Sequence, residues 1–158
     1  MTAANSPRLS LAALLATKPG HRPRLIYRTH RGRRRGIGRR KGLTEADYAR
    51  LLDAAHRQLG GPIVLVWDNL NTHVGAAMAE LVAARPWLTV YRLPPYAHEL
   101  NPVEPVWAHL KRSLANLTKH NLAELTALVK TRLKRMQYRP GLLVGFLAST
   151  SLDLGPFV

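Results

Sequence analysis

Two short apolar segments open the hydrophobic pattern of the chain. Residues 8–17 (RLSLAALLAT) and 24–30 (RLIYRTH) are separated by a Lys-Pro-Gly triplet at 18–20, which is typical of a tight turn. This pattern predicts a β-hairpin. Because residues 9–16 are rich in Leu and Ala, a helix in the first segment stays open as an alternative.

The pattern then changes to helical spacing and back to that of a strand. Apolar residues recur with helical periodicity from Tyr48 to Leu59, and Thr44 is a candidate N-cap for this helix. Ile63–Trp67 is an uninterrupted apolar run, which is typical of a strand buried on both faces. Asp68 follows this run directly.

Further helices and one more strand complete the pattern. They are a helix over 74–85, a strand over 88–93, a helix capped by Asn101 with Pro102 at its first position, a helix capped by Asn121, and a short apolar segment from Pro140 to about Ala148. The strand–helix–strand part is expected to be parallel and right-handed. A hairpin beside parallel strands gives a mixed sheet flanked by helices, so the predicted class is α/β.

Composition narrows the classes of function. The length of 158 residues corresponds to one domain, and 46% apolar residues allow a real core. The absence of Cys excludes disulfide scaffolds, Cys-ligated zinc and thiol catalysis. No apolar run is long enough to span a membrane. The chain has 24 Lys and Arg against 9 Asp and Glu, and this excess indicates a polyanionic partner, nucleic acid before an acidic membrane surface.

The positive charge is concentrated near the start of the chain. Residues 31–42 (RGRRRGIGRRKG) combine seven basic residues with four Gly and have no apolar face, so we expect a flexible basic loop there. Near a phosphate backbone, such a loop would add affinity without sequence selectivity. A solvated loop is the alternative. The candidate nucleic-acid-binding residues are Arg31, Arg33, Arg34, Arg35, Arg39, Arg40 and Lys41.

Two carboxylates are candidates for chemistry, and each also has an ordinary structural explanation. Asp68 follows the most apolar strand, where sites form in α/β sheets, but Asp-Asn is also a common turn pair. Glu104 is the third residue after Asn101, which is where a capping-box Glu belongs. Asn121 and Glu124 repeat that spacing, so a capping role for Glu104 is a serious alternative.

The order of the motifs between these carboxylates is more specific than either residue. Val-Leu-Val-Trp-Asp-Asn at residues 64–69 is followed by His73, by Pro-Pro-Tyr at 94–96 and by Glu-Leu-Asn-Pro-Val-Glu at 99–104, and thirty-five residues separate Asp68 from Glu104. This pattern resembles the catalytic core of DDE-type transposases, in particular the bacterial insertion-sequence branch of the mariner superfamily. The resemblance is close over residues 62–117.

The resemblance implies an RNase H-like fold and a role in DNA transposition. In that family three carboxylates hold two divalent ions, Mg²⁺ or Mn²⁺, for strand cleavage at element ends and joining to target DNA. Asp68 matches the second carboxylate and Glu104 the third, as catalytic residues and metal ligands. Asn69, His73 and Asn101 match supporting motif positions, although His73 could equally be a residue making a local hydrogen bond at a helix start.

One departure from the family pattern affects the expected activity. The family's first Asp lies on a strand before the hairpin, whereas the first acid here is Glu45. The helix-turn-helix region that usually precedes the catalytic core is also missing from this sequence. We therefore expect residues 1–158 to be one N-terminally truncated catalytic domain, an RNase H-like sheet without its first strand. This chain is then an enzyme by resemblance only, with little activity alone.

The partners and the competing functions follow from the same features. We expect DNA as partner (element ends and target), an association with itself or with a full-length transposase, no membrane, and the bacterial cytoplasm as the location. A non-catalytic DNA-binding regulator derived from a transposase is the main alternative. A ribosomal-type RNA-binding protein explains the charge but leaves the motifs unexplained, and only 6% of the residues are aromatic.

Overall fold

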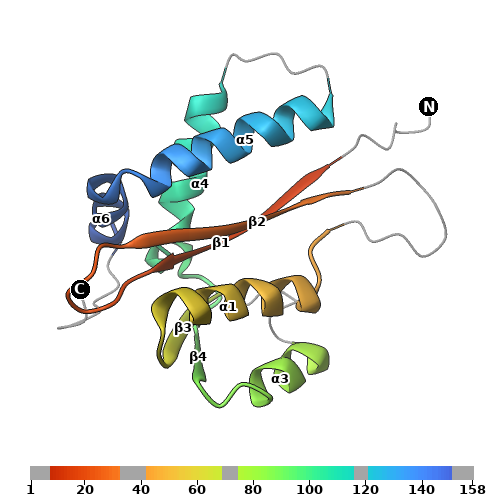
Figure 1. Cartoon of the computed structure of the whole chain (residues 1–158), viewed down its shortest axis with the longest axis vertical. Helices are drawn as coiled ribbons and strands as arrows, with labels where there is room; N and C mark the ends of the chain where they lie inside the picture. Colours follow the sequence, from red (N-terminus) through yellow and green to blue (C-terminus); the bar gives the residue numbers. More distant parts are fainter. Residues whose placement is uncertain (1–7, 33–41, 69–74, 116–120, 151–158) are drawn as a thin grey trace.

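A computed structural model describes residues 8–32, 42–68, 75–115 and 121–150 of the chain. Its strands and helices follow one another in the order that the apolar pattern predicts (Figure 1). In chain order they are β1 (Leu9–Ala16), β2 (Arg24–Arg31), α1 (Glu45–Leu59), β3 (Ile63–Trp67), α3 (Ala76–Ala83), β4 (Leu88–Arg92), a 3₁₀ turn (His98–Leu100), α4 (Val103–Leu114), α5 (Leu122–Gln137) and α6 (Pro140–Ala148).

The first two strands form the predicted antiparallel hairpin, so the helical alternative for residues 9–16 is wrong. The ladder pairs Leu9 with Arg31 at one end and Ala16 with Arg24 at the other. Gly20 adopts a left-handed φ of 76° in the turn, which glycine tolerates better than other residues. Because Arg31 still pairs within the hairpin, it is not part of the predicted basic loop, and residues 33–41 of that loop lie outside the described residues.

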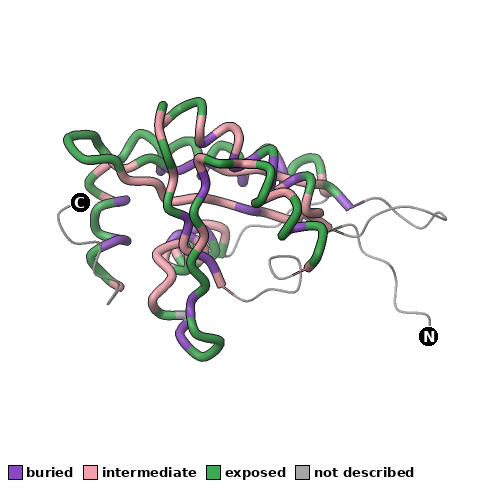
Figure 2. The backbone as a smooth tube through the Cα atoms, turned by 90° about the horizontal axis from the view of Figure 1, so that it is seen from below, coloured by how far each residue is buried: buried purple, intermediate pink, exposed green. Residues whose placement is uncertain are grey.

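The hairpin lies between two layers of helices. Successive residues of a strand point to opposite faces, and β1 supplies apolar residues to both. Leu11 and Leu15 pack on the cluster formed with α4, α5 and α6, whereas Ala12 and Leu14 pack toward α1. Figure 1 shows α1 and α5 on opposite sides of the hairpin, and Figure 2 shows buried positions recurring along the strands and the helices.

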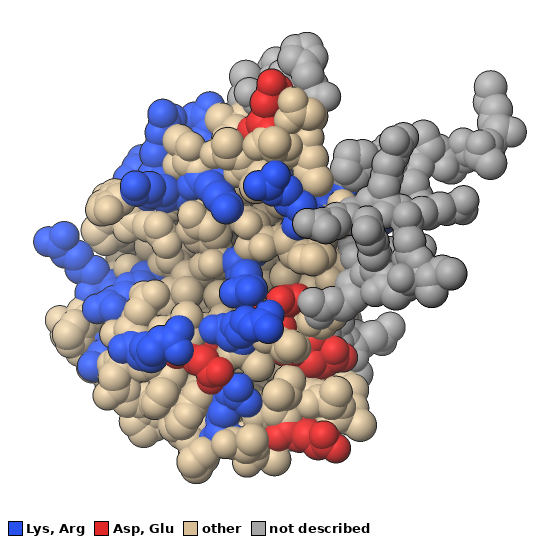
Figure 3. Space-filling view, turned by 45° about the vertical axis from the view of Figure 1, so that its right-hand side comes forward, with Lys and Arg blue, Asp and Glu red and all other residues tan. Residues whose placement is uncertain are grey.

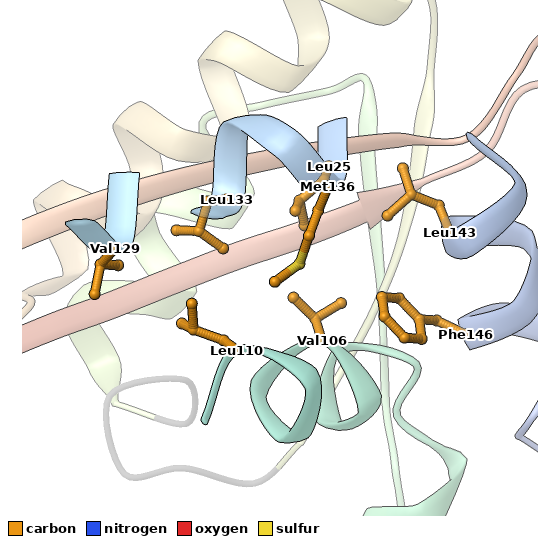
Figure 4. Packing of buried hydrophobic residues seen from close by; sticks show 8 residues of the cluster. All are labelled: Leu25, Val106, Leu110, Val129, Leu133, Met136, Leu143 and Phe146. Carbon is orange, nitrogen blue, oxygen red and sulfur yellow. The ribbon is translucent and has the colours of Figure 1, made fainter. Parts of the chain in front are cut away.

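The main core lies between the hairpin and the last three helices. Val106, Leu133 and Leu143, from α4, α5 and α6, are each 0% exposed. Their side chains point toward one another in Figure 4, together with other members of the cluster. The buried members are Leu25, Val106, Leu110, Val129, Leu133, Met136, Leu143 and Phe146.

The second pair of strands is parallel, as expected for a strand–helix–strand unit. The ladder runs from Ile63 beside Leu88 to Trp67 beside Arg92. Only one face of this pair is buried: Leu65 and Trp67 are buried, whereas Val64 is 67% exposed. The prediction of a strand buried on both faces was therefore wrong. The reason is that, among the described residues, α1 and α3 cover this pair and both lie on its Leu65 side.

The α/β class is confirmed, but the strands do not form one continuous ladder. Within the described residues, β1–β2 and β3–β4 are two separate two-stranded sheets. β1 and β3 therefore each have a ladder partner on one side only, which leaves strand edges of the kind that pair with further strands. No helix among the described residues is both long and apolar enough to cross a membrane.

Candidate active site

Asp68 stands at the carboxyl end of the parallel strand pair. The backbone N–H of Leu93, the first residue after β4, donates to the carbonyl of Trp67 at 2.7 Å. This bond extends the ladder to the residue before Asp68, so the backbone there is held in place. The Asp68 side chain is half-buried. Because both strands are parallel, Asp68 and the loop after β4 leave the sheet at the same edge.

The negative charge of Asp68 affects the ionisation of Tyr48 on α1. Burial raises the pKa of the Tyr48 phenol, and the negative charges of Asp68 and Asp47 raise it further. The Asp68 carboxylate therefore lies near α1 as well as at the end of β3. No pattern in the sequence indicated this neighbour, because the helical spacing of α1 only marked Tyr48 as a residue of the apolar face.

The connection from β4 to α4 is a compact turn. Leu93 and Ala97 are buried, and the Ala97 N–H donates to the Pro94 carbonyl at 3.1 Å. The Asn101 side-chain oxygen then accepts a hydrogen bond from the Val103 N–H at 3.1 Å. Asn101 therefore accepts from an N–H of the first turn of α4, but it is not the N-cap residue that the sequence predicted. The helix itself begins at Val103, one residue later than predicted, with Pro102 at the N-cap.

Glu104 is exposed in the first turn of α4, and its carboxylate makes no capping-box contact. The Glu104 N–H donates to the Asn101 carbonyl at 3.1 Å, but no hydrogen bond or ion pair of its side chain occurs among the described residues. A true capping box does form at the start of α1, where Asp47 accepts from the Thr44 N–H at 2.9 Å. Capping therefore does not explain the carboxylate of Glu104.

The remaining predicted site residues lie mostly outside the described part of the chain. Asn69 and His73 fall in the gap between residues 68 and 75, and of the candidate DNA-binding residues only Arg31 is described. Arg31 is exposed at the end of β2. The residues outside the described part are Asn69, His73, Arg33, Arg34, Arg35, Arg39, Arg40 and Lys41.

The donor chemistry of the site suits a divalent ion but does not complete a site for one. Asp68 and Glu104 offer carboxylate oxygens, the ligands that Mg²⁺ and Mn²⁺ prefer. Within the described residues, however, no three His, Cys, Asp or Glu side chains come together as a group that could hold a metal. The described part of this chain therefore presents two candidate ligands without a third.

Comparison with known proteins identifies the family. The family model for the DDE superfamily endonuclease matches residues 25–128, which is most of the chain and includes both candidate carboxylates. The chain belongs to the DDE superfamily endonucleases. The DDE assignment accounts for the order of the motifs between Asp68 and Glu104, as the sequence resemblance implied.

Solved structures agree with this DDE assignment at the level of the fold. The chain is similar to the structure of the Mos1 transposase catalytic domain and Raltegravir with Mn, with a TM-score of 0.54 and 11% identity over 93% of this chain and 84% of that one. It is also similar to the crystal structure of the catalytic domain of Mos1 mariner transposase, with a TM-score of 0.52 and 11% identity over 92% and 83%. No curated protein sequence matches the chain. The fold is therefore RNase H-like, as in a mariner transposase catalytic domain.

Proposed function

We propose that this chain serves in DNA strand cleavage and joining by an insertion-sequence transposase of the mariner type. The observation that carries the proposal is the placement of two carboxylates in a DDE fold. Asp68 leaves the carboxyl end of a parallel strand, and Glu104 opens the helix that follows the neighbouring strand. The Glu104 side chain makes no ion pair or capping-box contact with the described residues.

Each carboxylate stands on backbone that the core holds in place. The ladder bond between Leu93 and Trp67 positions the end of β3 before Asp68. Two residues after Glu104, Val106 is completely buried against α5 and α6, which anchors the first turn of α4. Such anchoring suits a ligand that must keep its place while a charged substrate binds. Magnesium or manganese is the ion that this pair is proposed to hold.

We further propose that the chain alone is inactive, because Asp68 and Glu104 supply only two of the three carboxylates of the family. Incubation of the purified chain with supercoiled plasmid in Mg²⁺ or Mn²⁺ tests this point. We expect no nicking above that of the Glu104→Gln variant. Metal-dependent nicking by the unmodified chain that is lost in Glu104→Gln would refute the proposed inactivity and establish a complete site.

The second candidate function is a DNA-binding regulator derived from a transposase. The absence of a third carboxylate beside Asp68 and Glu104 within the described residues favours it. Such a protein would occupy DNA, or pair with a full-length transposase, without cutting. In an assay with an active transposase of the same element, a regulator would lower the yield of cleaved ends as its concentration rises. An unchanged or increased yield would exclude that role. Self-association and a cytoplasmic location remain predictions.

A further inference from the structure

A row of basic and polar side chains lines the outer face of α5 near its end. Lys134, Arg135 and Tyr138 follow Thr131 by three, four and seven residues, which places all four on one face of the helix. Together with Arg139 they line an open groove of about 440 Å³. We call these five residues the α5 basic groove.

The cations of the α5 basic groove are not neutralised within the described protein. No ion pair of the described residues involves Lys134, Arg135 or Arg139. The single acid of α5, Glu124, stands in its first turn, at the opposite end of the helix. In Figure 3, Lys and Arg side chains are spread over much of this face of the molecule, whereas most of the Asp and Glu side chains lie in the lower half of the view.

Helix electrostatics explain only part of this arrangement. Cations in the last turn of a helix are favoured by the helix dipole, and Lys134 and Arg135 occupy that turn. The dipole does not account for Arg139, which lies beyond the helix, or for Tyr138, whose side chain is 76% exposed between cations. An exposed aromatic ring among unpaired cations is a combination that binds nucleic acid, through phosphate contacts and base stacking.

The α5 basic groove lies at the end of α5 that packs near the start of α4. Figure 4 shows Val106 of α4 close to Met136 of α5 and beside Phe146 of α6, while Leu110 lies toward Val129 of α5.

We propose that the α5 basic groove binds the phosphate backbone of DNA. This inference rests on the proposed function, because it takes DNA to be the polyanion that the chain binds. Lys134 and Arg135 each contact a phosphate, Arg139 extends the contact past the end of the helix, and Tyr138 stacks on a base where the DNA is single-stranded. The carboxylates take no part in this binding, so it requires no divalent ion.

The test is DNA binding in EDTA, measured by fluorescence anisotropy with a labelled 30-base-pair duplex over a range of salt. The double variant Lys134→Gln/Arg135→Gln removes two proposed phosphate contacts. Each contact contributes about 0.9 to the salt slope, so the slope falls by about 1.8, and affinity at 0.1 M salt falls by up to about 60-fold. Melting curves check that these exposed substitutions leave the fold intact.

The chain contains a matched control. Lys111 and Arg112 are also an adjacent pair of exposed cations in the last turn of a helix, α4, but they stand outside the groove. Lys111→Gln/Arg112→Gln changes the net charge and the helix-end electrostatics in the same way. We expect its salt slope to stay close to that of the unmodified chain. Equal losses in both double variants would overturn the inference, because the effect would then be one of net charge alone.

The outcomes separate this inference from the proposed function. If the unmodified chain binds no DNA, the proposed function and the groove both fail. If it binds DNA and the groove variant matches the control, only the groove fails. Tighter, groove-dependent binding of duplex RNA than of duplex DNA would contradict DNA as the occupant.

Tyr138 has its own readout. Stacking predicts that Tyr138→Ala weakens binding to single-stranded DNA by at least about fivefold, whereas Tyr138→Phe, which keeps the ring, binds like the unmodified chain. Equal binding by the alanine and phenylalanine variants would exclude stacking.

Discussion

The carboxylate of Glu104 offers a sharp test, because a structural role and a functional role predict different stabilities. Its side chain has no hydrogen bond or ion pair with the described residues, so Glu104→Gln should remove only a favourable interaction with the N-terminus of α4. At an exposed position that interaction amounts to about 0.5 kcal/mol. We therefore predict almost unchanged folding stability for Glu104→Gln.

Asp47, in the first turn of another helix, provides a comparison in which the carboxylate does contribute to folding stability. Its side chain is only 6% exposed and accepts hydrogen bonds from the Thr44 N–H at 2.9 Å and the Thr44 hydroxyl at 3.1 Å. The Arg50 guanidinium adds a longer contact of 3.3 Å. Removing the charge and one acceptor of a buried carboxylate that has several donors lowers the free energy of unfolding by about 2–3 kcal/mol. Asp47→Asn should therefore destabilise the fold by about that amount.

Urea denaturation followed by circular dichroism at pH 7 measures both changes. In thermal melts, a loss of 2–3 kcal/mol corresponds to a fall in Tm of about 4–12 °C for a domain of this size, and a loss of 0.5 kcal/mol to about 1–2 °C. If Glu104→Gln cost as much as Asp47→Asn, the Glu104 carboxylate would be part of the fold, and the argument that it is left exposed for a ligand would fail.

Three further predictions concern stability. Asp53 accepts two hydrogen bonds from Arg85, at 2.7 and 2.9 Å, and these bonds lower the pKa of Asp53. The stability that this pair contributes is therefore present above about pH 4 and is lost as the pH falls through the lowered pKa. Because Asp53 is 37% exposed, Asp53→Asn should cost only about 0.5–1 kcal/mol at pH 7, and the difference from the unmodified chain should shrink in acid denaturation series. Leu133→Ala should cost about 2–5 kcal/mol in urea titrations, because the side chain is completely buried in the main core; a loss under 1 kcal/mol would contradict that packing. Burial and the nearby charges of Arg112 and Arg139 lower the pKa of His109, so folding stability should fall as the pH drops below about 6.5. His109→Gln should remove that part of the pH dependence of stability. A variant with the same pH profile as the unmodified chain would contradict this prediction.

Local patterns were sufficient to predict most of the elements. The Lys-Pro-Gly triplet and the two apolar runs beside it indicated the hairpin, and helical spacing indicated α1, α4 and α5. The boundary error at Pro102 is one residue: Pro102 already has helical backbone angles, φ −66° and ψ −10°, but it is the N-cap and the helix begins at Val103. Such details depend on backbone angles that residue types do not determine alone.

Features that depend on distant residues were not predictable. The apolar run of β3 did not reveal that Val64 would be exposed, because this depends on which helices cover each face. The separation of the two strand pairs also depends on the whole arrangement. For the site, Glu104 and Glu124 follow their Asn residues at the same spacing, so spacing could not decide between capping and chemistry. In the structure, the Glu104 carboxylate is exposed and makes no capping-box contact, and this observation decides against a capping role.

The account rests on Asp68 and Glu104 sharing one divalent ion, and paramagnetic broadening by Mn²⁺ tests this most directly without requiring activity. In two-dimensional amide spectra of the whole chain, low concentrations of Mn²⁺ should broaden signals at the end of β3 and at the start of α4 first. The double variant Asp68→Asn/Glu104→Gln should lose this selective broadening. Broadening that is centred elsewhere, or that persists unchanged in the double variant, would contradict a shared metal site.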